Sequence, residues 1–117
     1  MYKLVKNILF VCSANKQRSK TAEDYFSGQY VEVNFHSAGT NIKLCQKEGT
    51  NPLNGMMIQN ADLVFVMEHK QKAEIKKITG QQFSEKIIVL NIPDVYKYYD
   101  KELIKILSLK VQEYLRD

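Results

Sequence analysis

Residues 7–23 read N-I-L-F-V-C-S-A-N-K-Q-R-S-K-T-A-E. Residues 8–12 are a short, continuous apolar run rich in β-branched and aromatic side chains, which is typical of a strand buried on both faces of a parallel sheet. A polar turn follows, and helix-favouring residues begin at Arg18. A strand, a tight loop and a helix N-terminus in this order bring backbone N–H groups and the positive end of a helix dipole together, so the segment predicts an oxyanion site.

The residues that bracket this loop predict its chemistry. Five residues separate Cys12 from Arg18, which is about enough chain to curl around one phosphate group. Asn15 tolerates the left-handed backbone that such a curl requires. Arg18 can bind two phosphate oxygens through its planar fork, and Cys12, beside a helix N-terminus and a guanidinium, is expected to be a thiolate. We therefore predict Cys12 as a nucleophile; the alternative is an inert cysteine at the end of a core strand. The predicted phosphate-binding residues and their support are Ser13, Ala14, Asn15, Lys16, Gln17 and Ser19.

Residues 11–23 (V-C-S-A-N-K-Q-R-S-K-T-A-E) resemble the active-site loop of the low-molecular-weight protein tyrosine phosphatases, a loop that the thioredoxin-coupled arsenate reductases share. Residues 37–40 (S-A-G-T), 61–68 (A-D-L-V-F-V-M-E) and 93–96 (P-D-V-Y) match the same family in order, so the resemblance covers most of the chain. It implies a metal-independent phosphatase that hydrolyses aryl phosphate monoesters, such as phosphotyrosine, through a phosphocysteine and without a cofactor. It also implies that Ser37 supports the loop by a hydrogen bond to Asn15.

A carboxyl group is expected over this loop. Residues 91–100 (N-I-P-D-V-Y-K-Y-Y-D) follow an apolar run at 86–90, and the carboxyl ends of parallel strands share one edge of a sheet. Because a departing alkoxide or phenolate needs a proton donor, we predict Asp94 as the general acid, with a simple turn aspartate as the alternative. It corresponds to the acid of the family's Asp-Pro-Tyr motif, in the order Pro-Asp-Val-Tyr. Asp100 is the rival carboxylate but is better suited to cap the last helix. Tyr96 is expected at the rim, stacking on an aromatic leaving group.

The segment 41–60 is shorter than its counterpart in the family and has no aromatic residue between Thr40 and Leu63. Gly, Asn and Pro interrupt it, so only short helices fit. Cys45 lies here. The sequence leaves open whether Cys45 resolves an oxidised Cys12, pairs with it in a disulfide, or is a small apolar filler.

Composition sets broad limits. A chain of 117 residues predicts one domain, residues 1–117. The net charge of +4 comes from scattered lysines, which favours an anionic substrate, a phosphorylated protein or a small aryl phosphate, and not nucleic acid. The N-terminal apolar run is too short for a signal peptide and no stretch reaches membrane-spanning length, so we expect a cytoplasmic protein without a membrane partner. The dispersed cysteines and histidines indicate no metal site; the sequence does not indicate the oligomeric state.

Apolar runs or alternation predict strands at residues 8–12, 31–35, 63–67 and 86–90. Helical patterns separate them: one from Arg18 to about residue 27 with Gly28 as its stop, one at 68–78, and a last one after Asp100. We therefore predict an α/β fold, a three-layer structure with a four-stranded parallel sheet and helices on both faces.

Two other functions stay open from the sequence. One is an arsenate reductase-like redox enzyme, for which Cys45 is the only additional thiol in the chain. The other is a phosphate- or phosphopeptide-binding module with little turnover, which the short 41–60 segment motivates.

Overall fold

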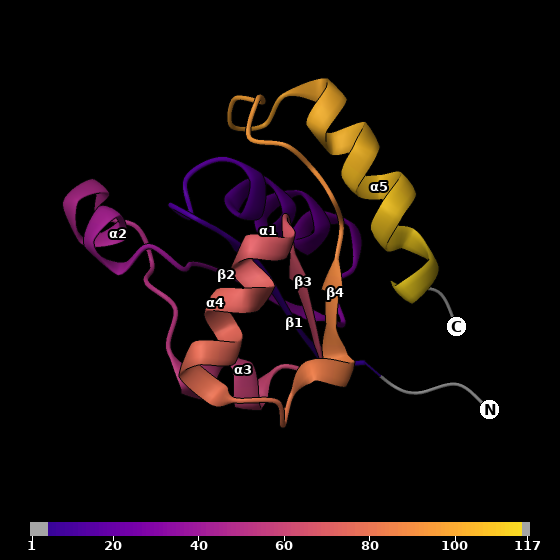
Figure 1. The fold of residues 1–117 in the computed structure, drawn as a ribbon. Helices are drawn as coiled ribbons and strands as arrows, with labels where there is room; N and C mark the ends of the chain where they lie inside the picture. The colour runs from indigo at the N-terminus through magenta and orange to yellow at the C-terminus, as the bar shows by residue number, and fades with distance from the viewer. Residues whose placement is uncertain (1–4, 116–117) are drawn as a thin grey trace.

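The computed structural model describes residues 5–115, so residues 1–4 and 116–117 of the expected domain lie outside the described part (Figure 1). Strands and helices alternate along it. In chain order they are β1 (Asn7–Cys12), α1 (Arg18–Gln29), β2 (Asn34–Gly39), α2 (Ile42–Glu48), α3 (Gly55–Asn60), β3 (Leu63–Val66), α4 (His69–Thr79), the 3-10 turn η1 (Ser84–Lys86), β4 (Ile87–Val89) and α5 (Lys101–Leu115).

The four strands form one parallel sheet in the order β2-β1-β3-β4. β1 is central, pairing with β2 on one side and β3 on the other. Cys12 is its last residue and lies beside Gly39 of β2. All four strands therefore end at the same edge, and the segments after β1, β3 and β4 are brought together there. The predicted α/β fold with a four-stranded parallel sheet is confirmed.

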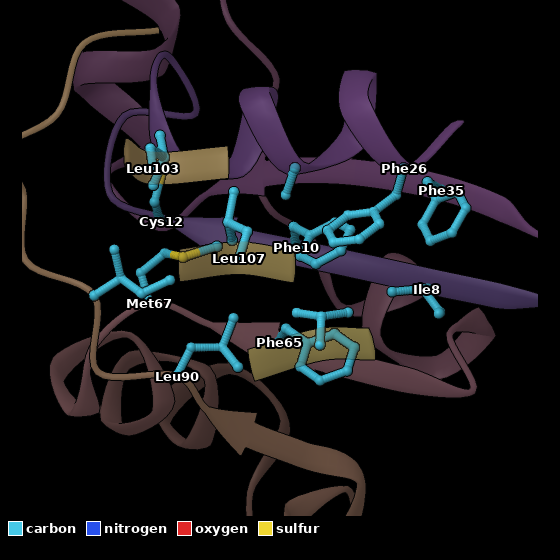
Figure 2. Packing of buried hydrophobic residues seen from close by; sticks show 13 residues of the cluster. Ile8, Phe10, Cys12, Phe26, Phe35, Phe65, Met67, Leu90, Leu103 and Leu107 are labelled. Carbon is cyan, nitrogen blue, oxygen red and sulfur yellow. The ribbon is translucent and has the colours of Figure 1, made fainter. Parts of the chain in front are cut away.

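Side chains of β1 alternate between the two faces of the sheet. Since they are apolar on both faces, helices cover both. Ile8, Phe10 and Cys12 face a core cluster that α1 and α5 complete (Figures 1 and 2). Leu9 and Val11 face a second cluster, to which α3 and α4 contribute. Phe10 is central to the first: its ring lies 5.6 Å from those of Phe26 and Phe65. As the last residue of β1, Cys12 therefore lies where the packed core meets the edge of the sheet.

Two predicted boundaries are wrong. The second strand, expected at residues 31–35, is Asn34–Gly39, and Val31 is 87% exposed. Its position is set by pairing with β1, where Ile8 lies opposite Phe35, and local alternation cannot reveal that register. Helix α1 runs through Gly28 to Gln29, and the Tyr30 N–H bonds the Phe26 carbonyl at 2.9 Å to close its last turn.

Candidate active site

The loop between Cys12 and Arg18 has the bend that the sequence predicts. Asn15 has φ 54°, in the left-handed region, and its amide is buried between two partners. Nδ2 donates to Ser19 Oγ at 2.9 Å, and Oδ1 accepts the Asn51 N–H at 3.1 Å. Helix α1 then begins without a side-chain cap and without an acidic residue in its first turn. Its N-terminal N–H groups are therefore not engaged by a side-chain cap and suit an anion.

The sulfur of Cys12 lies at the base of this loop. Cys12 is 3% exposed, and its Sγ lies 3.0 Å from Ser19 Oγ. Because Ser19 Oγ already accepts from Asn15, the Ser19 hydroxyl hydrogen can be directed at the sulfur. The sulfur thus has a polar partner and is not enclosed by hydrocarbon alone.

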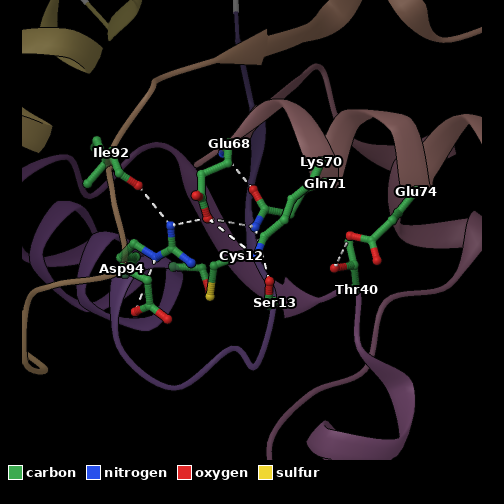
Figure 3. Close-up of polar contacts among 11 residues, drawn as sticks. Cys12, Ser13, Thr40, Glu68, Lys70, Gln71, Glu74, Ile92 and Asp94 are labelled. Atoms are coloured by element: carbon green, nitrogen blue, oxygen red, sulfur yellow. Dashed lines mark hydrogen bonds and ion pairs between the residues drawn. The ribbon is translucent and has the colours of Figure 1, made fainter.

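The guanidinium of Arg18 is buried, at 2% exposure, and is held in one orientation. Nη1 donates to Glu68 Oε1 at 2.7 Å and to the Ile92 carbonyl at 2.8 Å, while Nε lies 3.7 Å from Asp94 Oδ1 (Figure 3). Within residues 5–115 the hydrogen bonds of this side chain use Nη1, which leaves Nη2 for an incoming anion. Arg18 also ties the segment after β3 to the segment after β4.

Glu68 anchors this arginine. The hydrogen bond from Arg18 holds the pKa of the Glu68 carboxyl below its ordinary value, and partial burial opposes that shift only in part. The carboxylate consequently stays ionised at neutral pH and keeps its hold on Arg18. No role for Glu68 is predicted from the sequence. Its position gave a signal, since it follows an apolar strand at the same sheet edge as Cys12.

The segment after β2 supports the loop from behind. Thr50 Oγ1 donates to the Ala14 carbonyl at 2.6 Å, and Cys45 Sγ lies 3.5 Å from the same oxygen. Both cysteines are free, so the disulfide that the sequence left open is not formed. Lys16, on the exposed side of the loop, pairs with Glu48 at 2.7 Å.

The role expected of Ser37 is corrected by the structure. Its hydroxyl donates to Glu23 Oε1 at 2.5 Å and does not bond Asn15. Asn51 makes the connection, with its N–H on Asn15 Oδ1 and its Nδ2 on the Ser37 carbonyl at 2.8 Å. Sequence reasoning missed Asn51, which lies in the least regular part of the chain.

Asp94 lies on the loop between β4 and α5, beside Arg18 (Figure 3). Its side chain is 61% exposed to solvent. The rival Asp100 accepts the Glu102 N–H at 2.8 Å and so caps α5, as predicted. The loop is anchored at its far end, where the Tyr99 N–H donates to Thr21 Oγ1 at 2.8 Å and the Tyr98 hydroxyl to Asp24 at 2.5 Å. The loop therefore holds a solvent-exposed carboxylate beside the arginine.

Tyr96 and Gln17 were also expected at the site. Tyr96 is half-buried against the core cluster that includes Cys12. Gln17 precedes α1, and its carbonyl accepts the Thr21 N–H at 2.9 Å. Among residues 5–115, no group of three or more His, Cys, Asp and Glu side chains could hold a metal ion. In the same part of the chain, no helix is long and apolar enough to cross a membrane.

No family model matches the chain. A curated relative does: the low molecular weight protein-tyrosine-phosphatase Ptp of Acinetobacter johnsonii is 30% identical over 136 aligned positions, which cover 96% of this chain and 94% of the relative. The chain belongs to the low-molecular-weight protein tyrosine phosphatase family. It is therefore a cysteine-dependent phosphatase, and the arsenate reductase alternative is not favoured.

Solved structures of this phosphatase family have the same fold. The tyrosine phosphatase AmsI of Erwinia amylovora superposes with a TM-score of 0.75 at 23% identity, covering 96% of this chain and 92% of that one. Wzb of Vibrio vulnificus, in complex with benzylphosphonate, gives a TM-score of 0.76 at 19% identity over 94% and 97% of the two chains.

Proposed function

We propose that this phosphatase hydrolyses aryl phosphate monoesters of the phosphotyrosine type, with Cys12 as nucleophile, Arg18 as phosphate ligand and Asp94 as general acid. One observation carries the proposal. The Cys12 sulfur at the end of β1, the fixed Arg18 guanidinium at the start of α1 and the exposed Asp94 carboxylate on the loop after β4 lie at one sheet edge. The relative's name refers to phosphotyrosine in protein, and a phosphorylated protein or a small aryl phosphate is the substrate class that we propose.

The first step is attack of the Cys12 thiolate on phosphorus. A sulfur–phosphorus bond forms and the ester oxygen leaves with the electrons of its bond to phosphorus. Asp94, in its protonated form, donates a proton to that oxygen. In the second step the Asp94 carboxylate takes a proton from water, the water oxygen attacks phosphorus, and the sulfur–phosphorus bond breaks. Inorganic phosphate and the thiolate are the products.

The loop stabilises the charge that builds up on the equatorial oxygens. We expect Arg18, the backbone N–H groups of residues 13–17 and the N-terminus of α1 to surround the phosphoryl group above the sulfur. Because Glu68 and the Ile92 carbonyl already fix Arg18, little reorganisation is needed when the phosphoryl group arrives. Tyr96 is the residue that we propose for the pocket wall beside an aromatic leaving group.

Residues 1–117 act as one domain in this proposal, and the cytoplasm is the proposed location. A reactive thiolate keeps its activity where thiols remain reduced, and both cysteines of this chain are free. Neither a nucleic acid nor a membrane partner is part of the proposal.

The function is tested with purified protein and p-nitrophenyl phosphate. We expect hydrolysis that is unchanged by EDTA, because the proposed nucleophile and charge stabilisation come from protein groups. Activity that disappears with chelator and returns with a divalent cation would contradict the mechanism. Submillimolar binding of phosphate without turnover would indicate a binding module.

Asp94→Asn should slow departure of poor leaving groups. The amide cannot donate a proton as a carboxylic acid does, so kcat for phenyl phosphate should fall about 10²-fold or more. For p-nitrophenyl phosphate, whose phenolate leaves without much protonation, the loss should be smaller. Comparing kcat across substituted phenyl phosphates measures this difference, and Asp100→Asn is the matched control, expected to keep the wild-type pattern. Equal losses for all leaving groups would exclude Asp94 as the acid.

A further inference from the structure

Gln71 is a polar side chain with 0% exposure that the mechanism above does not use. It lies in the first turn of α4, three residues after Glu68. A buried amide is tolerated only when its hydrogen bonds are satisfied. The partners of Gln71 therefore show which parts of the molecule it holds.

Within residues 5–115, the hydrogen-bond partners of the Gln71 side chain belong to the proposed phosphate-binding site. Oε1 accepts the Glu68 N–H at 2.5 Å, and Nε2 donates to Ser13 Oγ at 3.1 Å and lies 3.5 Å from Glu68 Oε1 (Figure 3). Because the Glu68 N–H can only donate, the Gln71 oxygen must face it. The amide nitrogen must then face Ser13, so the network leaves a single orientation for this side chain.

These partners control the two ends of the loop. Ser13 is the first loop residue after Cys12, and Glu68 holds Arg18, which closes the loop. The buried Gln71 amide, in α4, thus connects the start of the loop with the arginine at its end.

We propose that Gln71 is a positioning residue of this phosphatase, which sets the distance between the first loop amides and the Arg18 guanidinium that a bound phosphoryl group requires. The inference rests on the proposed function, because it assumes that the loop binds a phosphoryl group. Displacement of a binding group by about 1 Å can cost about 10²-fold in rate. Loss of Gln71 should therefore weaken both turnover and phosphate binding.

The test compares Gln71→Leu with Gln71→Glu. Both kcat and KM for p-nitrophenyl phosphate and the Kd for inorganic phosphate are measured well below the melting temperature. Gln71→Leu should lower kcat/KM and phosphate affinity by about 10- to 100-fold each. Gln71→Glu keeps the acceptor for the Glu68 N–H but loses the donor to Ser13. Its activity should recover as the pH falls and the introduced carboxyl is protonated, a pH profile that a merely structural role would not produce.

The matched control is Asn54→Ala. Asn54 caps α3, where its Oδ1 accepts the Met57 N–H at 3.0 Å, away from the loop. This variant should lower the melting temperature and leave kcat/KM within about threefold of wild type. The double variant Ser13→Ala with Gln71→Leu should lose little more activity than Gln71→Leu alone, because both changes remove the same hydrogen bond.

Several outcomes would overturn the proposal. They are wild-type phosphate affinity in both Gln71 variants, losses no larger than those of Asn54→Ala, or fully additive effects in the double variant. If Gln71→Leu does not fold, the pH profile of Gln71→Glu decides. If the wild type binds phosphate but does not hydrolyse aryl phosphates, the proposed function fails while the phosphate affinities of the variants still decide the role of Gln71.

Discussion

Cys12→Ser should reduce turnover of an aryl phosphate by roughly four orders of magnitude or more while phosphate binding persists. A serine hydroxyl is far less ionised at neutral pH than a thiol, and within residues 5–115 the hydrogen-bond partner of the Cys12 sulfur is Ser19, which is not a general base. Ser19, 3.0 Å from the sulfur, can donate a hydrogen bond to an anion, but its hydroxyl is too weak a base to take the proton of a neutral serine hydroxyl. The proposed nucleophile is therefore lost, but the loop and Arg18, which we propose bind phosphate, remain.

Three measurements check this expectation: kcat with p-nitrophenyl phosphate, the Kd for inorganic phosphate, and the melting temperature. The exchange changes volume little at a buried position, so the fold should survive. Wild-type enzyme denatured rapidly during turnover should carry a phosphoryl group, and Cys12→Ser should become phosphorylated far more slowly. Retention of more than a tenth of wild-type kcat would show that another group attacks phosphorus.

Arg18→Lys should lower kcat/KM by about 10²- to 10³-fold, the usual cost of losing one preorganised group that stabilises transition-state charge. Lysine keeps the positive charge but not the planar fork. It cannot satisfy Glu68 Oε1 and the Ile92 carbonyl while also presenting two N–H groups to phosphate. Both phosphate affinity and kcat should therefore fall, even though the net charge is unchanged.

Lys20→Met provides the control for charge alone. Lys20 lies two residues after Arg18 in α1 and forms surface ion pairs with Glu23 and Asp24. Removing this cation should change kcat/KM by less than about threefold, since exposed ion pairs and screened charges contribute little. If Arg18→Lys matches wild type in kcat/KM, the bidentate role of Arg18 is wrong.

The candidate catalytic stretch could be recognised from the sequence because its signals are local. An apolar run, a five-residue polar loop and a helix start lie within residues 7–23, and Asn15 adopts the left-handed backbone expected of it. The choice of Asp100 as a helix cap was also local, since a cap bonds a residue two or three positions away. Family motifs added the carboxylate on the loop after β4.

The supports of the site were not readable in this way. Each support is far in sequence from the residue that it contacts. Asn51 is 36 residues from Asn15. Glu68 is 50 residues from Arg18, and Gln71 is 58 residues from Ser13. No local pattern marks such contacts. The hydrogen bond expected between Ser37 and Asn15 was replaced for the same reason, because the path of residues 50–53 along β2 places Asn51 between them.

The sequence by itself determined the parallel α/β architecture, the position of Cys12 at the end of the first strand, and the curl of the loop toward α1. These follow from burial patterns and backbone preferences of neighbouring residues. Only the tertiary structure decided where β2 begins, how Arg18 is oriented, and which side chains hold the loop. Those features depend on strand register and on hydrogen bonds between distant segments, which form only when the sheet brings the ends of β1, β3 and β4 to one edge.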